Sequence, residues 1–196
     1  MGVRIGVLDL QGNVSEHLLA FREALALSGQ EKGSTVVPIR SAAEIAGCDG
    51  LAIPGGESTT IARMVDRKGM RDPIRNFPGG IFATCAGLIL LATAVEDDRR
   101  FPPLGILDVT VRRNAFGRQR ESFEQDLLLE GEKEPFHAVF IRAPVITRTG
   151  AGVRVLAQLP QGAIAVAQGP HLGLAFHPEL FRDRRLHLRF LAGLSV

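Results

Sequence analysis

Cys85 lies in the sequence context that best suits a nucleophile. It belongs to the segment ATCAG, residues 83–87, in which an apolar strand is predicted to run directly into an Ala/Leu-rich helix. Small residues on both sides permit the tight turn of a nucleophile elbow, and the N-terminus of the helix favours the thiolate. A buried cysteine at the end of a strand is an equally good interpretation of these five residues alone.

His177 and Glu179 could supply a general base and the carboxylate that orients it. In an extended backbone alternate side chains share a face, so the two residues that flank Pro178 are expected to point the same way. Such a histidine takes the proton of a thiol and returns it to a leaving amine. The alternative is a His-Pro turn with a solvated glutamate, which loses most of its weight once Cys85 is considered beside it.

A glycine-rich turn, PGGE at residues 54–57, follows a predicted buried strand. Ligands of open α/β sheets bind at the carboxyl edge of the sheet, where this turn and Cys85 are both expected to lie. Glycine lets a backbone N–H approach a reacting carbonyl, so the N–H groups of Gly56 and Ala86 could form an oxyanion hole. An ordinary glycine turn is the alternative.

Alternating strands and helices must position these residues. In the first half, hydrophobic periodicity and turn residues predict strands at residues 3–8, 35–39, 50–53 and 81–84, and helices at 14–27, 41–47, from 59 onward and at 86–95. In the second half they predict strands at 109–111, 127–129, 138–141, 153–159, 163–167 and 172–176, then a helix at 183–194. This order predicts an α/β fold with a mostly parallel, mixed central sheet flanked by helices on both faces.

The composition is that of an ordinary globular chain. With 196 residues, 45% of them apolar and 22% charged, we expect a single domain spanning residues 1–196. The longest apolar runs are too short to span a bilayer and the N-terminus does not resemble a secretory signal, so we expect a cytoplasmic protein with no membrane partner. Two cysteines without metal-ligand spacing predict neither a disulfide framework nor a metal site.

Positive charge does not indicate a nucleic-acid partner. The net charge is only +2, and the absence of Trp and Tyr leaves few side chains for stacking on bases. Two arginine clusters nevertheless stand out, and each could be a solvated face, a docking surface or an anion site. They are Arg112, Arg113, Arg118 and Arg120, and Arg182, Arg184 and Arg185.

The motifs PGGES, TCAG and HPE, in this order and spacing, resemble those of the class I glutamine amidotransferases with a Cys-His-Glu triad. Within that class, five segments are similar to the glutaminase subunits of the pyridoxal 5'-phosphate synthases that work without deoxyxylulose phosphate. These segments are GVLDLQGN, PGGESTTI, RRNAFGRQRESFE, VFIRAP and AFHPEL. The similarity extends over nearly the whole chain and implies a flavodoxin-like three-layer sandwich.

The resemblance also implies roles for particular residues. Cys85 is the expected nucleophile, with His177 and Glu179 as its partners and the N–H groups of Gly56 and Ala86 as the oxyanion hole. The expected contacts of L-glutamine are Gly56, Glu57, Ser58, Arg113, Ile141 and Arg142. No cofactor is implied. The expected partner is a (β/α)-barrel synthase subunit, with which the chain forms a hetero-oligomer and to which it passes ammonia.

Two residues depart from the usual pattern of that family. Ala83 stands where the elbow usually has glycine, which should be tolerated if its φ is negative, and Asp9 stands where the first strand usually ends in alanine. Asp9 could contact the partner subunit or merely cap its turn.

Four histidines outside the triad have no catalytic context, so we expect surface or packing roles for them, with His17 on the polar face of the first helix. They are His17, His137, His171 and His187. Two other functions fit the same elbow. One is a cysteine hydrolase acting on peptides or small acyl compounds, and the other is a regulatory subunit without activity, which the complete triad argues against.

Overall fold

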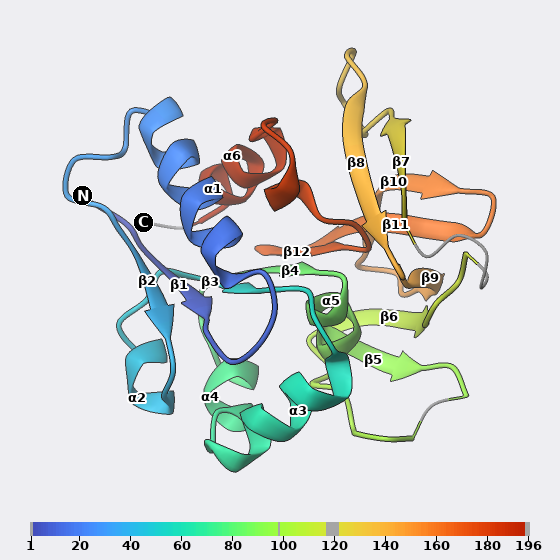
Figure 1. Ribbon diagram of the computed structural model, residues 1–196, viewed down its shortest axis with the longest axis horizontal. Helices are drawn as coiled ribbons and strands as arrows, with labels where there is room; N and C mark the ends of the chain where they lie inside the picture. Colours follow the sequence, from blue (N-terminus) through green and yellow to red (C-terminus); the bar gives the residue numbers. More distant parts are fainter. Residues whose placement is uncertain (1, 98, 117–121, 195–196) are drawn as a thin grey trace.

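The computed structural model describes residues 2–97, 99–116 and 122–194, and in these residues ten strands form one mixed sheet. Their order across the sheet is β2-β1-β3-β4-β12-β11-β9-β6-β5, with β10 paired to β11 (Figure 1). The strands are β1 (Arg4–Leu8), β2 (Thr35–Ile39), β3 (Gly50–Ile53), β4 (Gly80–Thr84), β5 (Ala92–Val95), β6 (Leu107–Arg112), β9 (Val145–Thr149), β10 (Arg154–Leu159), β11 (Gly162–Gln168) and β12 (His171–Leu174). A separate hairpin joins β7 (Ser122–Leu127) to β8 (Phe136–Ile141).

Helices cover both faces of the sheet, which confirms the predicted α/β fold class. The helices α1 (Val14–Leu27) and α6 (Arg185–Ala192) lie on one face, and α2 (Ala42–Ile45), α3 (Ser58–Arg67) and α4 (Arg71–Arg75) on the other (Figure 1). The first strands are continuous apolar runs because they are buried on both faces. All four residues of β3 and all five of β4 are buried.

The sheet changes direction at β12. On one side β12 runs parallel to β4, with Leu174 opposite Thr84, and on the other side it runs antiparallel to β11. The chain therefore returns from its second half to complete the parallel sheet of its first half. This pairing brings the segment after β12 beside the segment after β4.

Several local predictions were wrong or incomplete. The apolar run at 86–95 is not one helix, since α5 (Ala86–Leu91) ends where Ala92 turns extended, with ψ 160°, and β5 begins. Of the strand predicted at 127–129 only Leu127 is in a strand, as the last residue of β7, and both β9 and α4 were missed. In α3, Ile61 and Val65 are buried against the sheet, whereas Met64 is only half-buried. No helix among the described residues is long and apolar enough to cross a membrane.

Candidate active site

Four strand ends converge on one edge of the sheet. The strands β1, β3, β4 and β12 are mutually parallel neighbours, so the segments that follow them leave the sheet on the same side. These segments carry Gln11 and Asn13 after β1, the glycine turn after β3, Cys85 after β4 and His177 after β12. This is the edge at which α/β sheets bind ligands.

Cys85 occupies a strained turn between β4 and α5. Its φ is 47° and its ψ −103°, a conformation that non-glycine residues rarely adopt and that often marks functional sites. Its N–H donates to the carbonyl of Leu174 at 2.8 Å, which ties the turn to β12. A Cβ at Gly87 would lie 2.2 Å from the carbonyl oxygen of Ile53, so the first turn of α5 packs directly on β3. Ala83 lies in β4 without a positive φ, as its tolerance requires.

His177 and Glu179 face each other, although not in the way predicted. Residues Pro178–Leu180 form a 3-10 turn instead of an extended segment, because the N–H of Leu180 returns to the carbonyl of His177. Within this turn His177 Nδ1 is 2.7 Å from Glu179 Oε1. The turn therefore replaces strand alternation as the reason for the pairing. Both side chains are buried, and His177 N–H donates to the carbonyl of Val139 at 2.8 Å.

The electrostatics of this pair favour an ionised couple. Burial alone lowers the pKa of His177, but hydrogen bonds with Cys85 and Glu179 raise it to about 10. Burial raises the pKa of Glu179, whereas the proximity of His17 and the hydrogen bond and charge of His177 lower it to about 2. His17 is itself uncharged at neutral pH, since burial lowers its pKa, so the partner that keeps Glu179 ionised is His177. A charged imidazolium paired with the Glu179 carboxylate is the state that such an environment stabilises.

The glycine turn after β3 lies against the side chains of Cys85 and His177. A Cβ at Gly55 would be 2.4 Å from His177 Cε1, so only glycine leaves room for the imidazole. The Gly55 N–H donates to Thr84 Oγ1 at 3.0 Å, and the Glu57 N–H donates to Gln11 Oε1 at 2.7 Å. These two hydrogen bonds fix the backbone on both sides of Gly56, which lines the site.

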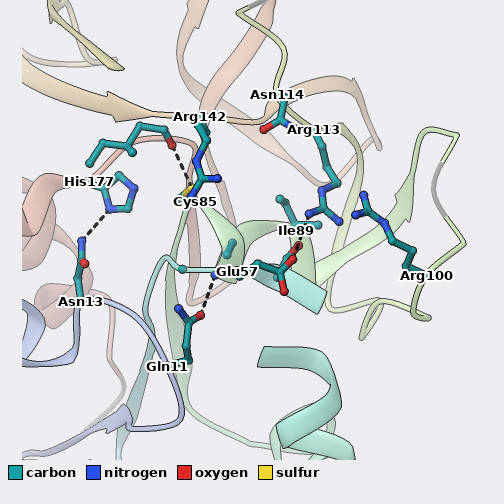
Figure 2. Close-up of a pocket in the computed structure, with 14 residues that line it drawn as sticks. Gln11, Asn13, Glu57, Cys85, Ile89, Arg100, Arg113, Asn114, Arg142 and His177 are labelled. Carbon is teal, nitrogen blue, oxygen red and sulfur yellow. Dashed lines mark hydrogen bonds and ion pairs between the residues drawn. The ribbon is translucent and has the colours of Figure 1, made fainter. Parts of the chain in front are cut away.

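A cavity of about 440 Å³ opens beside Cys85. Figure 2 shows Arg100 and Arg113 converging on the part of the cavity that holds Glu57, and Arg113 lies 3.5 Å from a Glu57 carboxylate oxygen. At the other end of the cavity, the Sγ of Cys85 is 3.8 Å from the carbonyl oxygen of Ile141. Positive and negative groups thus share a pocket whose inner end is a cysteine, an arrangement that fits a zwitterionic ligand.

Every residue predicted to contact the substrate lines this cavity, as do Cys85, Ala86 and His177. Glu179 lies behind His177 and does not reach it. Five further lining residues were not predicted, and these are Gln11, Asn13, Ile89, Arg100 and Asn114. Gln11 and Asn13 could have been predicted from the sequence, because they are polar residues that directly follow the first strand.

Asp9 and Arg184 each bind a partner within the chain. Asp9 is held by Arg40, whose Nε lies 2.6 Å from Asp9 Oδ2, so its carboxylate has a partner within the chain. Arg184 is buried and binds Glu23 and the carbonyl of Pro178, which makes it part of the packing under the 3-10 turn. Arg118 and Arg120 lie outside the described residues. Among the residues that are described, no group of three or more His, Cys, Asp or Glu side chains could hold a metal ion.

His17 was placed wrongly by the sequence analysis. It is completely buried instead of lying on a polar helix face, with Nε2 3.0 Å from Thr84 Oγ1 and 3.5 Å from Glu179 Oε2. His187 is also buried and stacks on Phe82, with 4.8 Å between ring centroids. His137 lies near the surface between Asp126 and Glu124.

A family model, curated proteins and a solved structure all match this chain over nearly its full length. Residues 7–194 match the SNO glutamine amidotransferase family. The chain is 57% identical over 195 residues to "Pyridoxal 5'-phosphate synthase subunit PdxT" of Methanoregula boonei, covering 99% of this chain and 100% of that protein. It is 55% identical over 196 residues to the protein of the same name from Methanosphaerula palustris, covering 100% of both. A crystal structure described as a glutamine amidotransferase superposes with a TM-score of 0.84 at 45% identity, covering 96% of this chain and 97% of that one.

Proposed function

Because the chain belongs to the SNO glutamine amidotransferase family, we propose that it is the glutaminase subunit of a pyridoxal 5'-phosphate synthase. It hydrolyses L-glutamine to L-glutamate and ammonia, and a synthase subunit takes up the ammonia. Two relatives that match this chain from end to end and bear the name of such a subunit support the proposal. We treat residues 1–196 as one glutamine amidotransferase domain.

The observation that carries the proposal is the position of Cys85 beside a buried His177–Glu179 pair at the inner end of a charged cavity. The thiolate attacks the side-chain amide carbon of glutamine, and the N–H groups of Gly56 and Ala86 receive the oxyanion. Ala86 is the first residue of α5, so its N–H has no partner within the helix. His177 then gives its proton to the departing ammonia, which leaves a thioester on Cys85.

Water completes the reaction. His177, now neutral, removes a proton from a water molecule that attacks the thioester carbon, and the C–S bond breaks to release L-glutamate. Glu179 keeps the imidazole oriented and stabilises its charged form in both half-reactions. The thiolate–imidazolium pair is regenerated.

The outer part of the cavity selects glutamine in this scheme. Glutamine brings an α-carboxylate and an α-ammonium, and the cavity offers Arg113 and Arg142 for the first and Glu57 for the second. Ser58 is buried at the cavity wall, and its hydroxyl has no hydrogen-bond partner among the described residues. A substrate atom would satisfy it. The carbonyl of Ile141 and the backbone of Gly56 complete the set.

The partner in this proposal is a (β/α)-barrel synthase subunit that uses the ammonia to form pyridoxal 5'-phosphate from a pentose phosphate and a triose phosphate. Free ammonia is then a wasted product, so the isolated chain should hydrolyse glutamine slowly and the partner should accelerate it. Glutamate release with and without the partner measures this. Equal rates would contradict the docking claim.

Two further measurements separate the glutaminase from a cysteine hydrolase of similar fold. Covalent labelling of Cys85 by a glutamine-like electrophile should be blocked by free L-glutamine and not by peptides. The Cys85→Ala variant should lose all measurable glutamate release, and Cys48→Ala, at a core residue that does not line the cavity, is the matched control. Retained activity in Cys85→Ala would refute the mechanism.

A further inference from the structure

The start of α1 contacts the Glu179 carboxylate, which lies behind His177 and does not line the cavity. Asn13 Nδ2 donates to Glu179 Oε1 at 3.2 Å, whereas His17 Nε2 lies 3.5 Å from Glu179 Oε2 without a hydrogen bond, and that buried oxygen has no other hydrogen-bond partner among the described residues. Asn13 and His17 are four residues apart, so both face the same side of the helix. The two oxygens of one carboxylate therefore meet two side chains of one helical turn.

The side chain of Asn13 does not cap α1, although Asn13 occupies the N-cap position. It occupies the N-cap of α1, where asparagine commonly accepts a hydrogen bond from the helix, yet its side chain caps no N–H of this described turn. Its amide nitrogen instead lies between Glu179 Oε1 and His177 Nδ1, at 3.2 and 3.4 Å (Figure 2 shows the second contact). His177 Nδ1–H points to Glu179, so the carboxylate oxygen is the acceptor left for the amide.

The surroundings of His17 determine which of its nitrogens carries the proton. Burial lowers the pKa of His17, so the ring is neutral and has one N–H. Nε2 faces two oxygens, Thr84 Oγ1 at 3.0 Å and Glu179 Oε2 at 3.5 Å, whereas Nδ1 is buried with no hydrogen-bond partner among the described residues. A proton on Nδ1 would leave a buried donor unsatisfied and point a lone pair at a carboxylate. The proton therefore belongs on Nε2.

The same nitrogen connects Glu179 to the nucleophile and to the glycine turn. Thr84, whose Oγ1 it contacts, directly precedes Cys85, and that oxygen also accepts the N–H of Gly55 at 3.0 Å. His17 thus lies where the three segments of the site meet, at the ends of β3, β4 and β12. Nothing in this arrangement requires His17 to touch the substrate.

We propose that Asn13 and His17 are positioning residues that fix the Glu179 carboxylate against His177, Asn13 by its hydrogen bond to Oε1 and His17 by the polar contact of its Nε2 with Oε2. The proposal rests on the glutaminase function given above. A carboxylate held at one oxygen only can rotate away from His177 Nδ1, and the imidazole then loses its orientation for proton transfer. Groups that orient a metal-bound histidine typically contribute about 10- to 100-fold, and we expect a similar factor for a histidine that transfers a proton.

The kinetic test compares four variants in the full chain together with the synthase partner. His17→Leu and Asn13→Ala should each lower kcat by about 10- to 100-fold, with KM for glutamine within about twofold, because the outer cavity is untouched. His17→Gln retains an amide donor near the position of Nε2 and should recover most of the kcat lost in His17→Leu. His187→Leu is the matched control, since His187 is equally buried and stacks on Phe82, which His17 contacts edge-on, and makes no hydrogen bond in the described structure.

A second readout does not depend on glutamine. In a Cys48→Ala background Cys85 is the single thiol, and its alkylation by iodoacetamide can be followed from pH 5 to 10. Wild type should react at low pH because the imidazolium supports the thiolate. In His17→Leu and Asn13→Ala the low-pH reaction should slow at least threefold, while the rate at pH 10 stays that of wild type. His187→Leu should keep the wild-type profile even if its thermal midpoint falls.

The outcomes separate the two proposals. If wild type releases no glutamate with the partner but the alkylation profiles shift as expected, the glutaminase function fails and the positioning role stands. If His17→Leu and His187→Leu lower kcat equally, or if neither Asn13→Ala nor His17→Leu changes the alkylation profile, the positioning role is overturned. Asn13→Ala decides the matter should His17→Leu fail to fold, because Asn13 is only half-buried.

Discussion

Replacing Gly55 by alanine tests whether the space beside His177 sets the rate of the reaction. A Cβ on residue 55 would lie 2.4 Å from His177 Cε1 and 3.1 Å from Cys85 Cβ. Ordinary contact begins near 3.4 Å, so the imidazole must retreat by about 1 Å. The φ of Gly55 is not positive, so alanine can adopt its backbone conformation. The effect therefore comes from the side-chain contact.

A displacement of about 1 Å in a reacting group can reduce the rate on the order of 100-fold, or about 2.7 kcal/mol of transition-state stabilisation. We expect Gly55→Ala to lower kcat for glutamate release by about that factor. KM should change little, because Arg113 and Glu57 lie at the other end of the cavity. Overpacking should also lower the free energy of unfolding by about 1–3 kcal/mol.

The assay is glutamate release at saturating glutamine with the synthase partner present, beside a thermal unfolding curve to show that the variant is folded. Gly47→Ala is the matched control, since the nearest atom to its added Cβ is Arg4 Nε at 3.8 Å. It should have wild-type kcat. A folded Gly55→Ala protein with kcat within threefold of wild type would refute the reasoning that this space positions His177.

Three other predictions follow from the same geometry. Gly87→Ala would place a Cβ 2.2 Å from the backbone oxygen of Ile53, so urea denaturation should show a loss of unfolding free energy at the upper end of about 1–3 kcal/mol. Partial burial raises the pKa of Glu57, but hydrogen bonds from Thr60 and the N–H groups of α3 lower it to about 2. Wild type should thus be more stable than Glu57→Gln by up to about 1 kcal/mol above pH 4.5, and lose that advantage as the pH falls toward 2. Arg113→Lys should lower kcat/KM for glutamine roughly 10- to 100-fold, mainly through KM, because lysine cannot bind a carboxylate with two parallel hydrogen bonds.

The sequence indicated the fold class because strands and helices alternate with clear turn residues between them. It did not reveal where α5 ends, since every residue from Ala86 to Ala92 is buried and a continuous apolar run shows no period. The strand β9 was missed although its VITRT sequence is rich in β-branched residues, a signal that was available. The helix α4 is short and contains proline, so its sequence resembles a turn.

The candidate site was accessible to sequence reasoning where a residue type is tied to a turn or to a strand end. Cys85 and the glycine turn belong to this group. The role of His17 was not accessible, because its partners Thr84 and Glu179 are distant in the chain and the pattern of α1 alone does not say which face is covered. The pairing of His177 with Glu179 was expected for the wrong reason, since a 3-10 turn and an extended segment both place the two side chains within reach.

The parallel pairing of β4 with β12 has a consequence for how the enzyme is made. Thr84 and Leu174 lie opposite each other, yet about 90 residues separate them in the chain. At roughly 5–20 residues per second, β4 leaves the ribosome on the order of 5–20 s before its neighbour exists. During that interval Cys85 has neither His177 nor Glu179 beside it. The nascent chain therefore carries the Cys85 thiol alone, and the proposed nucleophile acquires its proposed base only when nearly the whole chain has been synthesised.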